Sequence, residues 1–204
     1  MIAYKFLRSG RVGPFSGYRW PEPRVLVGAS GTDPCRRGVH ACRIQDLPWW
    51  LADELWEIEL GGWVRADEHK IVAPAGRLRV RIDGWTPTCA QEFADVCAWR
   101  ARDHATAALV RTGYAAAARG LAACATLPVL VDSARALALE IPSARIILTI
   151  AGDGAYRAVT GAPPTSAYIA AHAALRLDGP AGYVAERAWQ SQWLVKRLGL
   201  TETA

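Results

Sequence analysis

The sequence changes character near Pro87, and this change limits the folds that the chain can adopt. Before Pro87, short runs of alternating apolar and polar residues are separated by turn residues rich in glycine and proline, a pattern typical of β-strands joined by loops. After Pro87 the chain is rich in alanine, and its apolar residues recur at helical spacing. We therefore predict an α+β protein, with a β-rich domain over residues 1–87 and an alanine-rich helical bundle over residues 88–204.

The alternating runs give the expected elements of the first domain. They predict one short helix at 46–53 and six short strands, at 3–7, 24–27, 39–42, 55–60, 71–73 and 77–82. For the second domain we expect four to six helices, the first starting near Thr88 and the last covering 181–198. Glycine and proline predict breaks between these helices, among them breaks at 152–154 and 178–180.

Composition and charge exclude some classes of function. With 51% hydrophobic residues in 204, the chain has enough apolar side chains to form a core. The net charge of +5 is spread evenly, because residues 1–87 hold 13 basic and 10 acidic residues and residues 88–204 hold 11 and 9, which sum to the 24 and 19 of the whole chain. Nucleic-acid binding normally needs basic residues clustered on one surface, so a nucleic-acid partner is not expected.

The N-terminus and the cysteines indicate where the protein resides. The first residues lack the apolar core of a signal peptide, and no apolar stretch approaches the roughly 20 residues of a membrane span. Five cysteines do not form an even disulfide framework, and the spacings of Cys35 with Cys42 and of Cys89 with Cys97 do not fit the usual zinc site. We expect a cytoplasmic protein with reduced thiols, no metal site and no membrane partner.

The first candidate site is the segment 38–43, which holds His40, Cys42 and Arg43 close to Cys35. An imidazole next to a thiol can activate it as a nucleophile, and His40 can also hydrogen-bond a ligand near neutral pH. The alternative is that His40 is a structural histidine. We take His40 as a catalytic candidate and Arg43 as a ligand-binding candidate.

The second candidate is the pair of carboxylates of Glu57 and Glu59, which share one face of the strand at 55–60. Paired carboxylates can act as general acid and base. Arg77, Arg79 and Arg81 likewise share one face of the strand at 77–82. If the two strands are neighbours, the same residues form ordinary cross-strand ion pairs instead. Both interpretations remain open from the sequence.

The third candidate is a set of aromatic residues in the first domain. Six of the nine tryptophans lie before residue 88, more than the core of so small a domain can hide, so some should line a ligand pocket. A planar or nucleotide-like small molecule is the ligand that such a pocket fits. The expected ligand-binding residues of this pocket are Tyr4, Trp20, Arg24, Arg43, Trp49 and Trp56.

Two resemblances add to this interpretation. Tyr4-Lys5, the segment 35–42 with its Gly38-x-His40-Ala41-Cys42 core, the run 56–61 and the run 70–73 together resemble a small domain of uncharacterised function found in actinobacterial and phage proteins. That resemblance covers residues 1–85 and implies no particular activity.

The order of elements in the first domain is also similar to that of the compact ADP-ribosyltransferases that inactivate rifamycins. This similarity implies a bacterial transferase with NAD as cofactor. His40 then takes the place of the second motif, and Glu57 or Glu59 takes the acidic third place. The opening strand of that family offers His or Arg, where this chain has Tyr4 and Lys5.

The sequence thus favours a small-molecule enzyme or binding protein that uses a pocket in the first domain, with an ADP-ribosyltransferase-like enzyme as its most specific form. The alternative is an interaction module in which the helical domain forms homo-oligomers or docks a partner. That alternative is motivated by the alanine-rich helices and by Trp189 and Trp193, which we expect to form an exposed apolar face on the last helix.

Overall fold

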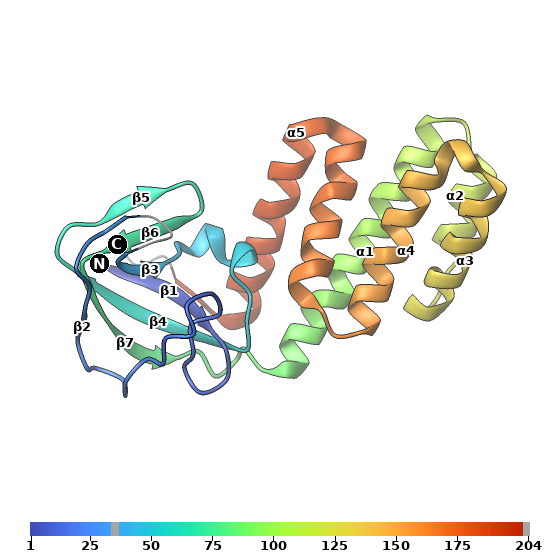
Figure 1. Ribbon diagram of the computed structural model, residues 1–204. Helices are drawn as coiled ribbons and strands as arrows, with labels where there is room; N and C mark the ends of the chain where they lie inside the picture. Colours follow the sequence, from blue (N-terminus) through green and yellow to red (C-terminus); the bar gives the residue numbers. More distant parts are fainter. Residues whose placement is uncertain (34–36, 202–204) are drawn as a thin grey trace. The chain divides into compact units, whose positions relative to one another are not determined.

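The structure is a computed structural model that describes residues 1–33 and 37–201, and it has an α+β fold. The chain forms two compact units (Figure 1). The first comprises Met1–Pro87 together with the residues from Ser191 onward, and the second comprises Thr88–Gln190. The first stretch of the first unit ends at Pro87, where the composition changes. The end of the last helix, which we assigned to the helical domain, packs with the first unit.

The first unit contains two small antiparallel sheets. The larger has the strand order β1-β4-β7-β2, built from β1 (Ile2–Leu7), β4 (Glu54–Gly61), β7 (Ala75–Arg81) and β2 (Val27–Gly28). The smaller has the order β3-β6-β5, built from β3 (Val39–Ala41), β6 (Lys70–Ala73) and β5 (Arg65–Asp67). Among the described residues, the isolated bridge between Tyr4 and Cys42 links the sheets, and their backbones exchange hydrogen bonds of 2.9 and 2.8 Å.

Strand alternation builds the core between these sheets. In β1, Ala3 and Leu7 point inward, and Lys5 lies between them on the same face. The apolar residues of the other strands alternate in the same way. The inward-facing residues form one buried cluster: Ala3, Leu7, Trp20, Val39, Ala41, Trp56, Ile58, Leu60, Ile71, Ala73 and Leu78.

The structure corrects two of the expected elements in this unit and adds one strand. The strand expected at 24–27 is only Val27–Gly28, because Arg24 has a φ of +73°, which a strand does not allow. The helix expected at 46–53 is a 3₁₀ helix, η1 (Ile44–Trp49). The three exposed residues of β5 give no apolar alternation, so this strand was not expected.

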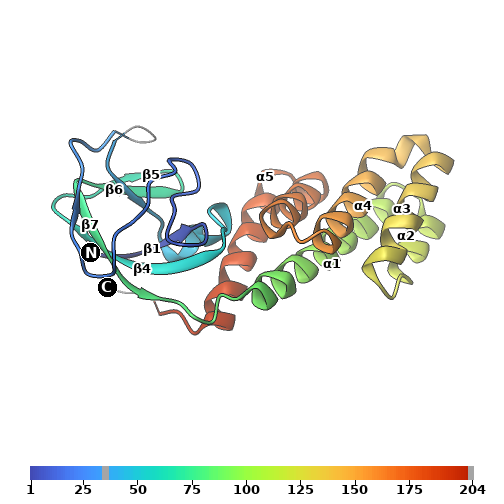
Figure 2. The ribbon, with the colours of Figure 1, turned by 60° about the horizontal axis from the view of Figure 1, so that its bottom comes forward.

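The second unit consists of helices that pack through small side chains. They are α1 (Pro87–Arg111), α2 (Ala115–Ala122), α3 (Leu127–Glu140), the short 3₁₀ helix η2 (Pro142–Ala144), α4 (Arg145–Val159) and α5 (Pro163–Leu198), of which α5 continues into the first unit. Figure 2, like Figure 1, shows α3 and α4 side by side. Alanine forms most of the buried cluster of this unit, which allows the helix backbones to approach closely.

The two breaks expected at glycine have different outcomes. The break at 178–180 is present, because Asp178 and Gly179 have non-helical backbone angles within α5. The break at 152–154 is wrong, because α4 runs through both glycines. A Cβ at Gly152 would lie 3.2 Å from the Cβ of Ala134, and one at Gly154 would lie 3.1 Å from the Cβ of Ala101. These glycines therefore allow close helix packing and do not end the helix.

Candidate functional site

A pocket of about 630 Å³ opens in the first unit beside β1, β3 and the loop that follows β1. Three of its lining residues carry basic side chains, namely Lys5, His40 and Lys70. Aromatic residues form much of the rest of its wall: Phe15, Tyr18, Trp20 and Trp50. We call this site the Lys5 pocket. Its volume lies within the roughly 300–1,000 Å³ of typical small-molecule sites.

Strand geometry brings the three basic residues together. Lys5 comes from β1, and its Nζ donates a 2.5 Å hydrogen bond to the backbone carbonyl oxygen of His40 in β3. The pairing of β3 with β6 sets His40 opposite Val72, and Lys70 lies two residues before Val72 on the same face of β6. The Tyr4–Cys42 bridge does not extend into a ladder, so the Lys5 side chain reaches the neighbouring strand just beyond it.

The loop between β1 and β2 supplies the aromatic wall. Its residues 8–19 are held by the isolated bridges Arg8–Val12 and Val12–Arg19. Phe15 lies at the tip, is 83% exposed and meets Trp50 edge-on at 6.0 Å between ring centroids. The loop thus carries an apolar side chain in solvent at the edge of the pocket.

Tyr18 and Trp20, the other two aromatic residues of this segment, follow Phe15 in the chain. Tyr18 is 47% exposed and meets the buried Trp20 edge-on at 5.9 Å. The Lys5 Nζ lies 5.1 Å from the centroid of the Trp20 ring, within cation–π range. The Trp20 ring is therefore an aromatic surface directly beside the cation.

The charge of Lys5 lies in an environment that disfavours it. Desolvation lowers the pKa of Lys5 to about 8. Among the described residues, no carboxylate forms an ion pair with its ammonium, whose contacts are the His40 carbonyl and the Trp20 ring. The nearby Cys42 offers no counter-charge, because burial raises the pKa of its thiol and keeps it protonated.

His40 is neutral in the same environment. Its pKa is lowered by desolvation first and then by the positive charges of Lys5 and Lys70. A neutral imidazole has one donor and one acceptor nitrogen, so it can take up a proton and release another. His40, expected as a catalytic residue, therefore lies in the pocket and in a form suited to proton transfer.

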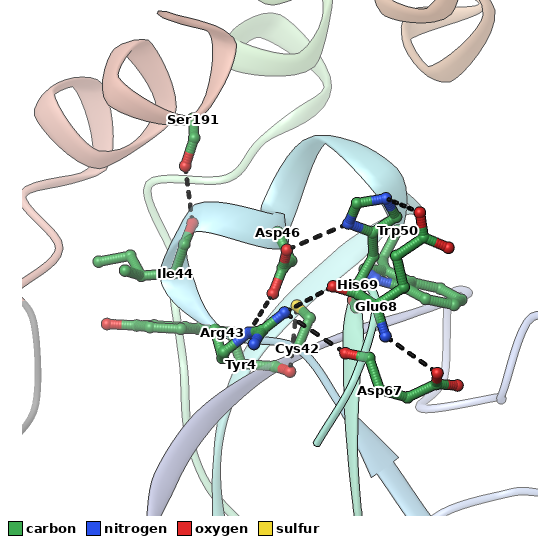
Figure 3. Close-up of polar contacts among 10 residues, drawn as sticks. All are labelled: Tyr4, Cys42, Arg43, Ile44, Asp46, Trp50, Asp67, Glu68, His69 and Ser191. Carbon is green, nitrogen blue, oxygen red and sulfur yellow. Dashed lines mark hydrogen bonds and ion pairs between the residues drawn. The ribbon is translucent and has the colours of Figure 1, made fainter. Parts of the chain in front are cut away.

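Arg43, expected to bind a ligand, takes part instead in a network of polar contacts (Figure 3). Its Nε lies 2.5 Å from the carboxylate of the buried Asp46, and its Nη2 donates to the carbonyl oxygen of Glu68 at 2.7 Å. The Trp50 indole N–H donates to the His69 carbonyl oxygen at 2.6 Å in the same network. Arg43 thus holds the turn between β5 and β6 against η1, and it does not line the Lys5 pocket.

Three aromatic residues that we expected to bind the ligand lie at three different positions in the first unit. Trp49 stacks on the His69 ring at 3.7 Å and lies outside the pocket. Trp56 is buried in the core, where its indole N–H donates to Glu54 at 2.9 Å. Tyr4 lines a smaller cavity of about 70 Å³ that shares Lys5 and His40 with the Lys5 pocket, and its hydroxyl donates to the Thr201 carbonyl at 3.2 Å.

The acidic candidates lie apart from His40. Glu59 accepts two hydrogen bonds from Arg77, of 2.9 and 3.0 Å, and Glu57 accepts one of 2.6 Å from Arg79, across the paired strands β4 and β7. Arg24 is exposed and lines a hollow of about 360 Å³ together with Glu59, Arg77, Arg79 and Val80. The structure therefore brings His40, Tyr4 and Trp20 together at Lys5, and it places Glu57, Glu59 and Arg24 elsewhere.

Sequence reasoning missed the lysines of the site. Neither Lys5 nor Lys70 is among the residues expected at the site. Alternation puts Lys5 on the same face of β1 as the inward-facing Ala3 and Leu7, so its charge lies toward the core side, but the sequence alone leaves the inward face of this strand undecided because both faces carry apolar residues. Phe15 was missed because only the fold brings the loop against η1. Cys35 lies outside the described residues.

The second unit holds its own buried charge. Glu186 is 1% exposed and accepts hydrogen bonds from Arg100 at 2.5 to 2.8 Å, and its carboxylate lies 2.9 Å from His104 Nε2 and 3.3 Å from Gln190 Nε2. Burial alone would raise the pKa of Glu186, but the hydrogen bonds of His104 and Arg100 outweigh it and lower that pKa to about 2. This cluster is fully paired.

The expected apolar face at Trp189 and Trp193 is not exposed, because both side chains are half-buried. The guanidinium carbon of Arg100 lies 3.8 Å from the centroid of the Trp189 ring and covers it. The helical spacing of apolar residues that predicted an exposed face therefore serves packing within the protein.

The described residues contain neither a metal-binding cluster nor a membrane-spanning helix. Within residues 1–33 and 37–201, no group of three or more His, Cys, Asp or Glu side chains could hold a metal ion. No helix in these residues combines the length and apolar character needed to cross a membrane. Comparison of the chain with protein-family models, curated proteins and solved structures found no match in any of the three.

Proposed function

We propose that this protein binds a small, planar, anionic molecule in the Lys5 pocket. The observation that carries the proposal is the Lys5 ammonium, which is desolvated beside an aromatic wall and has no carboxylate partner among the described residues. Desolvating a cation without a counter-ion is unfavourable, and an anionic ligand would supply the missing charge. The ligand's anionic group then lies between Lys5 and Lys70.

The aromatic wall defines the rest of the ligand. The Trp20 ring lies below the Lys5 ammonium, and the Phe15 and Tyr18 rings are partly exposed at the edge of the pocket. A planar ligand between these rings gains stacking and covers apolar surface that water contacts in its absence. Ligand binding would explain why the Phe15 side chain is exposed, which packing within the unit does not explain.

Nucleotides and NAD belong to this ligand class, because they combine planar bases with phosphate groups. The transferase version of the proposal therefore shares its first step with simple binding. It needs a carboxylate at the bound ligand in addition, and Glu57 and Glu59 are held by arginines beyond the Lys5 pocket. The pocket geometry thus supports binding more directly than ADP-ribosyl transfer.

The experiment is a binding measurement by calorimetry and tryptophan fluorescence. The panel contains aromatic carboxylates, aromatic sulfonates, nucleoside monophosphates and NAD, each paired with a neutral analogue of the same ring. We expect anions to bind and their neutral analogues to bind about tenfold to a hundredfold more weakly, the range for one charge-assisted hydrogen bond.

Two lysine variants serve as a matched pair in this measurement. Lys5→Met should lose the preference for anions, because it keeps the apolar stem and removes the cation. Lys196→Met makes the same chemical change at an exposed position outside the pocket and should bind like the unaltered protein. Equal binding by Lys5→Met, or no preference for anions, contradicts the proposal.

The second function, an interaction module, is favoured by one surface of the helical unit. Leu139 at the end of α3 is 77% exposed and lines a hollow of about 280 Å³ with residues of α4. Contiguous exposed apolar surface marks association sites, and Leu139 is an exposed apolar side chain that a partner surface could cover at this hollow. If the helical unit self-associates here, Leu139→Ser should lower the mass measured by sedimentation velocity, and an unchanged monomer mass in both proteins contradicts it.

A further inference from the structure

We propose that the ε-amine of Lys5 forms an imine with an aldehyde or ketone group of an anionic aromatic ligand. The inference rests on the proposed function, because the carbonyl compound must first bind in the Lys5 pocket. It narrows the ligand class from planar anions to planar anions that carry a reactive carbonyl.

The position of the amine favours this reaction. The His40 carbonyl oxygen accepts one N–H of Lys5 at 2.5 Å and fixes the nitrogen at the wall of the pocket. Lys5 lines both the Lys5 pocket and the adjoining smaller cavity, so a ligand can approach its nitrogen. A fixed amine and a bound carbonyl react as one molecule, which removes most of the entropic cost of their encounter.

The protonation state of the amine favours it as well. Only the unprotonated amine is a nucleophile, and an ordinary lysine is almost entirely protonated at neutral pH. Desolvation lowers the pKa of Lys5 to about 8, the same device that activates other nucleophilic lysines in apolar pockets. A substantial fraction of Lys5 is therefore a free amine in mildly alkaline solution.

The two pocket lysines have different roles in this reaction. The Nζ of Lys70 lies 3.2 Å from the Asp67 carboxylate and forms an ion pair with it. Lys5 forms no such pair among the described residues. Lys70 is thus suited to attract the anionic group of the ligand, while Lys5 reacts with the carbonyl.

The chemistry balances without an oxidant or a reductant. The lone pair of the Lys5 nitrogen attacks the carbonyl carbon, and the π electrons of the C=O bond move to oxygen. The nitrogen loses a proton and the oxygen gains one, which gives a carbinolamine. A second protonation of the oxygen lets it leave as water while the nitrogen lone pair forms the C=N bond, and loss of the remaining extra proton gives the neutral imine. The neutral imidazole of His40, beside Lys5, can relay these protons.

The test uses 4-formylbenzoate as the probe and sodium cyanoborohydride to reduce any imine to a stable amine, with peptide mapping by mass spectrometry. The chain contains three lysines, Lys5, Lys70 and Lys196. We expect Lys5 to be labelled about tenfold faster than the other two at pH 8, because desolvation lowers the pKa of its amine to about 8 and the pocket holds the probe beside it. The rate should saturate with probe concentration and rise with pH to a midpoint near 8. Equal labelling of all three lysines overturns the inference.

Two controls separate this inference from the proposed function. The alcohol 4-(hydroxymethyl)benzoate has the same ring and charge but no carbonyl, so it should bind in calorimetry and protect Lys5 from labelling. Lys5→Arg keeps the cation and removes the nucleophile, so it should bind the alcohol and show no labelling at position 5. Binding of the alcohol without labelling of Lys5 overturns the imine and leaves anion binding standing. No binding of the alcohol, together with no binding of any anion in the panel, overturns both.

Discussion

The two units treat a buried charge in opposite ways. In the helical unit, Glu186 is surrounded by Arg100, His104 and Gln190, and its carboxylate is stabilised as an anion. In the first unit, the ammonium of Lys5 has one carbonyl acceptor and an aromatic ring, and desolvation destabilises it as a cation. Glu186 is buried and Lys5 is half-buried, yet among the described residues the less buried charge is the one that lacks a counter-ion, so the contrast lies in the partners.

This difference separates a structural charge from a functional one. A buried charge with all its partners fixes how helices pack, because removing any partner leaves another charge unpaired. A desolvated charge without a counter-ion does not fix packing in this way, and the fold would be more stable without it. A ligand that supplies the counter-ion explains why such a charge is present. Variants of Glu186 and Lys5 test this contrast.

The largest effect is expected for Glu186→Gln. The variant keeps the shape of the side chain but leaves Arg100 and His104 without an anion, so the free energy of unfolding should fall by about 3–5 kcal/mol. Chemical denaturation followed by circular dichroism measures this change. Glu140→Gln, at an exposed position at the end of α3, is the control and should change it by less than about 0.5 kcal/mol. Equal effects of the two variants would remove the contrast between the units.

The second effect is a pH dependence from Lys5. Its pKa is about 8 in the folded protein and about 10.4 in an unfolded chain, so between these values the unfolded state binds more protons. Stability therefore rises as pH increases through this window, by about 2 kcal/mol between pH 7 and pH 10. The quantity to measure is the difference in unfolding free energy between the unaltered protein and Lys5→Met, which cancels the other titrating groups. If this difference in unfolding free energy does not change with pH, the conclusion that Lys5 is desolvated is wrong.

A somewhat smaller effect is expected for Lys5→Met at pH 7. The variant removes the desolvation cost of the cation and also its hydrogen bond to the His40 carbonyl. The net result should be a protein about 1–2 kcal/mol more stable that no longer distinguishes anions from neutral ligands. Thermal unfolding and calorimetry give the two readouts. Loss of stability together with loss of binding would show instead that Lys5 is a structural residue.

The sequence predicted the architecture because the relevant signals are local. Alternation in β4 and β7 put the carboxylates and the arginines each on one face, and cross-strand pairing was one of the two interpretations that this pattern allowed. The change in composition at Pro87 is likewise a local signal, and the first unit's first stretch ends there. The error at Gly152 arose because a glycine that allows close helix packing and one that ends a helix have the same local sequence.

The pocket was less predictable because it depends on contacts between distant segments. Phe15 and Trp50 meet only in the folded chain, and His40 reaches Lys5 through the isolated bridge at Tyr4 and Cys42. In β1 apolar residues lie on both faces, so the sequence did not show which of Tyr4 and Lys5 faces the pocket. Arg43 matched a ligand contact by residue type alone, but Asp46 and the Glu68 carbonyl hold it in the fold.

The smallest effects are expected for the cross-strand pairs, and they test the acidic candidates directly. Glu57 and Glu59 each bind an arginine on the partly exposed face of the larger sheet, where water screens the pairs. Glu57→Gln and Glu59→Gln should each lower the unfolding free energy by less than about 1 kcal/mol, and high salt should reduce these differences. Chemical denaturation at low and high salt measures both.

Neither substitution should alter ligand binding or labelling at Lys5, because the two carboxylates do not line that pocket. Arg79→Gln is the matched control for Glu57→Gln, since it breaks the same ion pair from the other strand. If Glu57→Gln abolished the response to ligand while Arg79→Gln kept it, the carboxylate itself would be needed, and an acid–base role for Glu57 would replace the cross-strand interpretation. Equal and small effects of the two variants would assign the pair to the sheet.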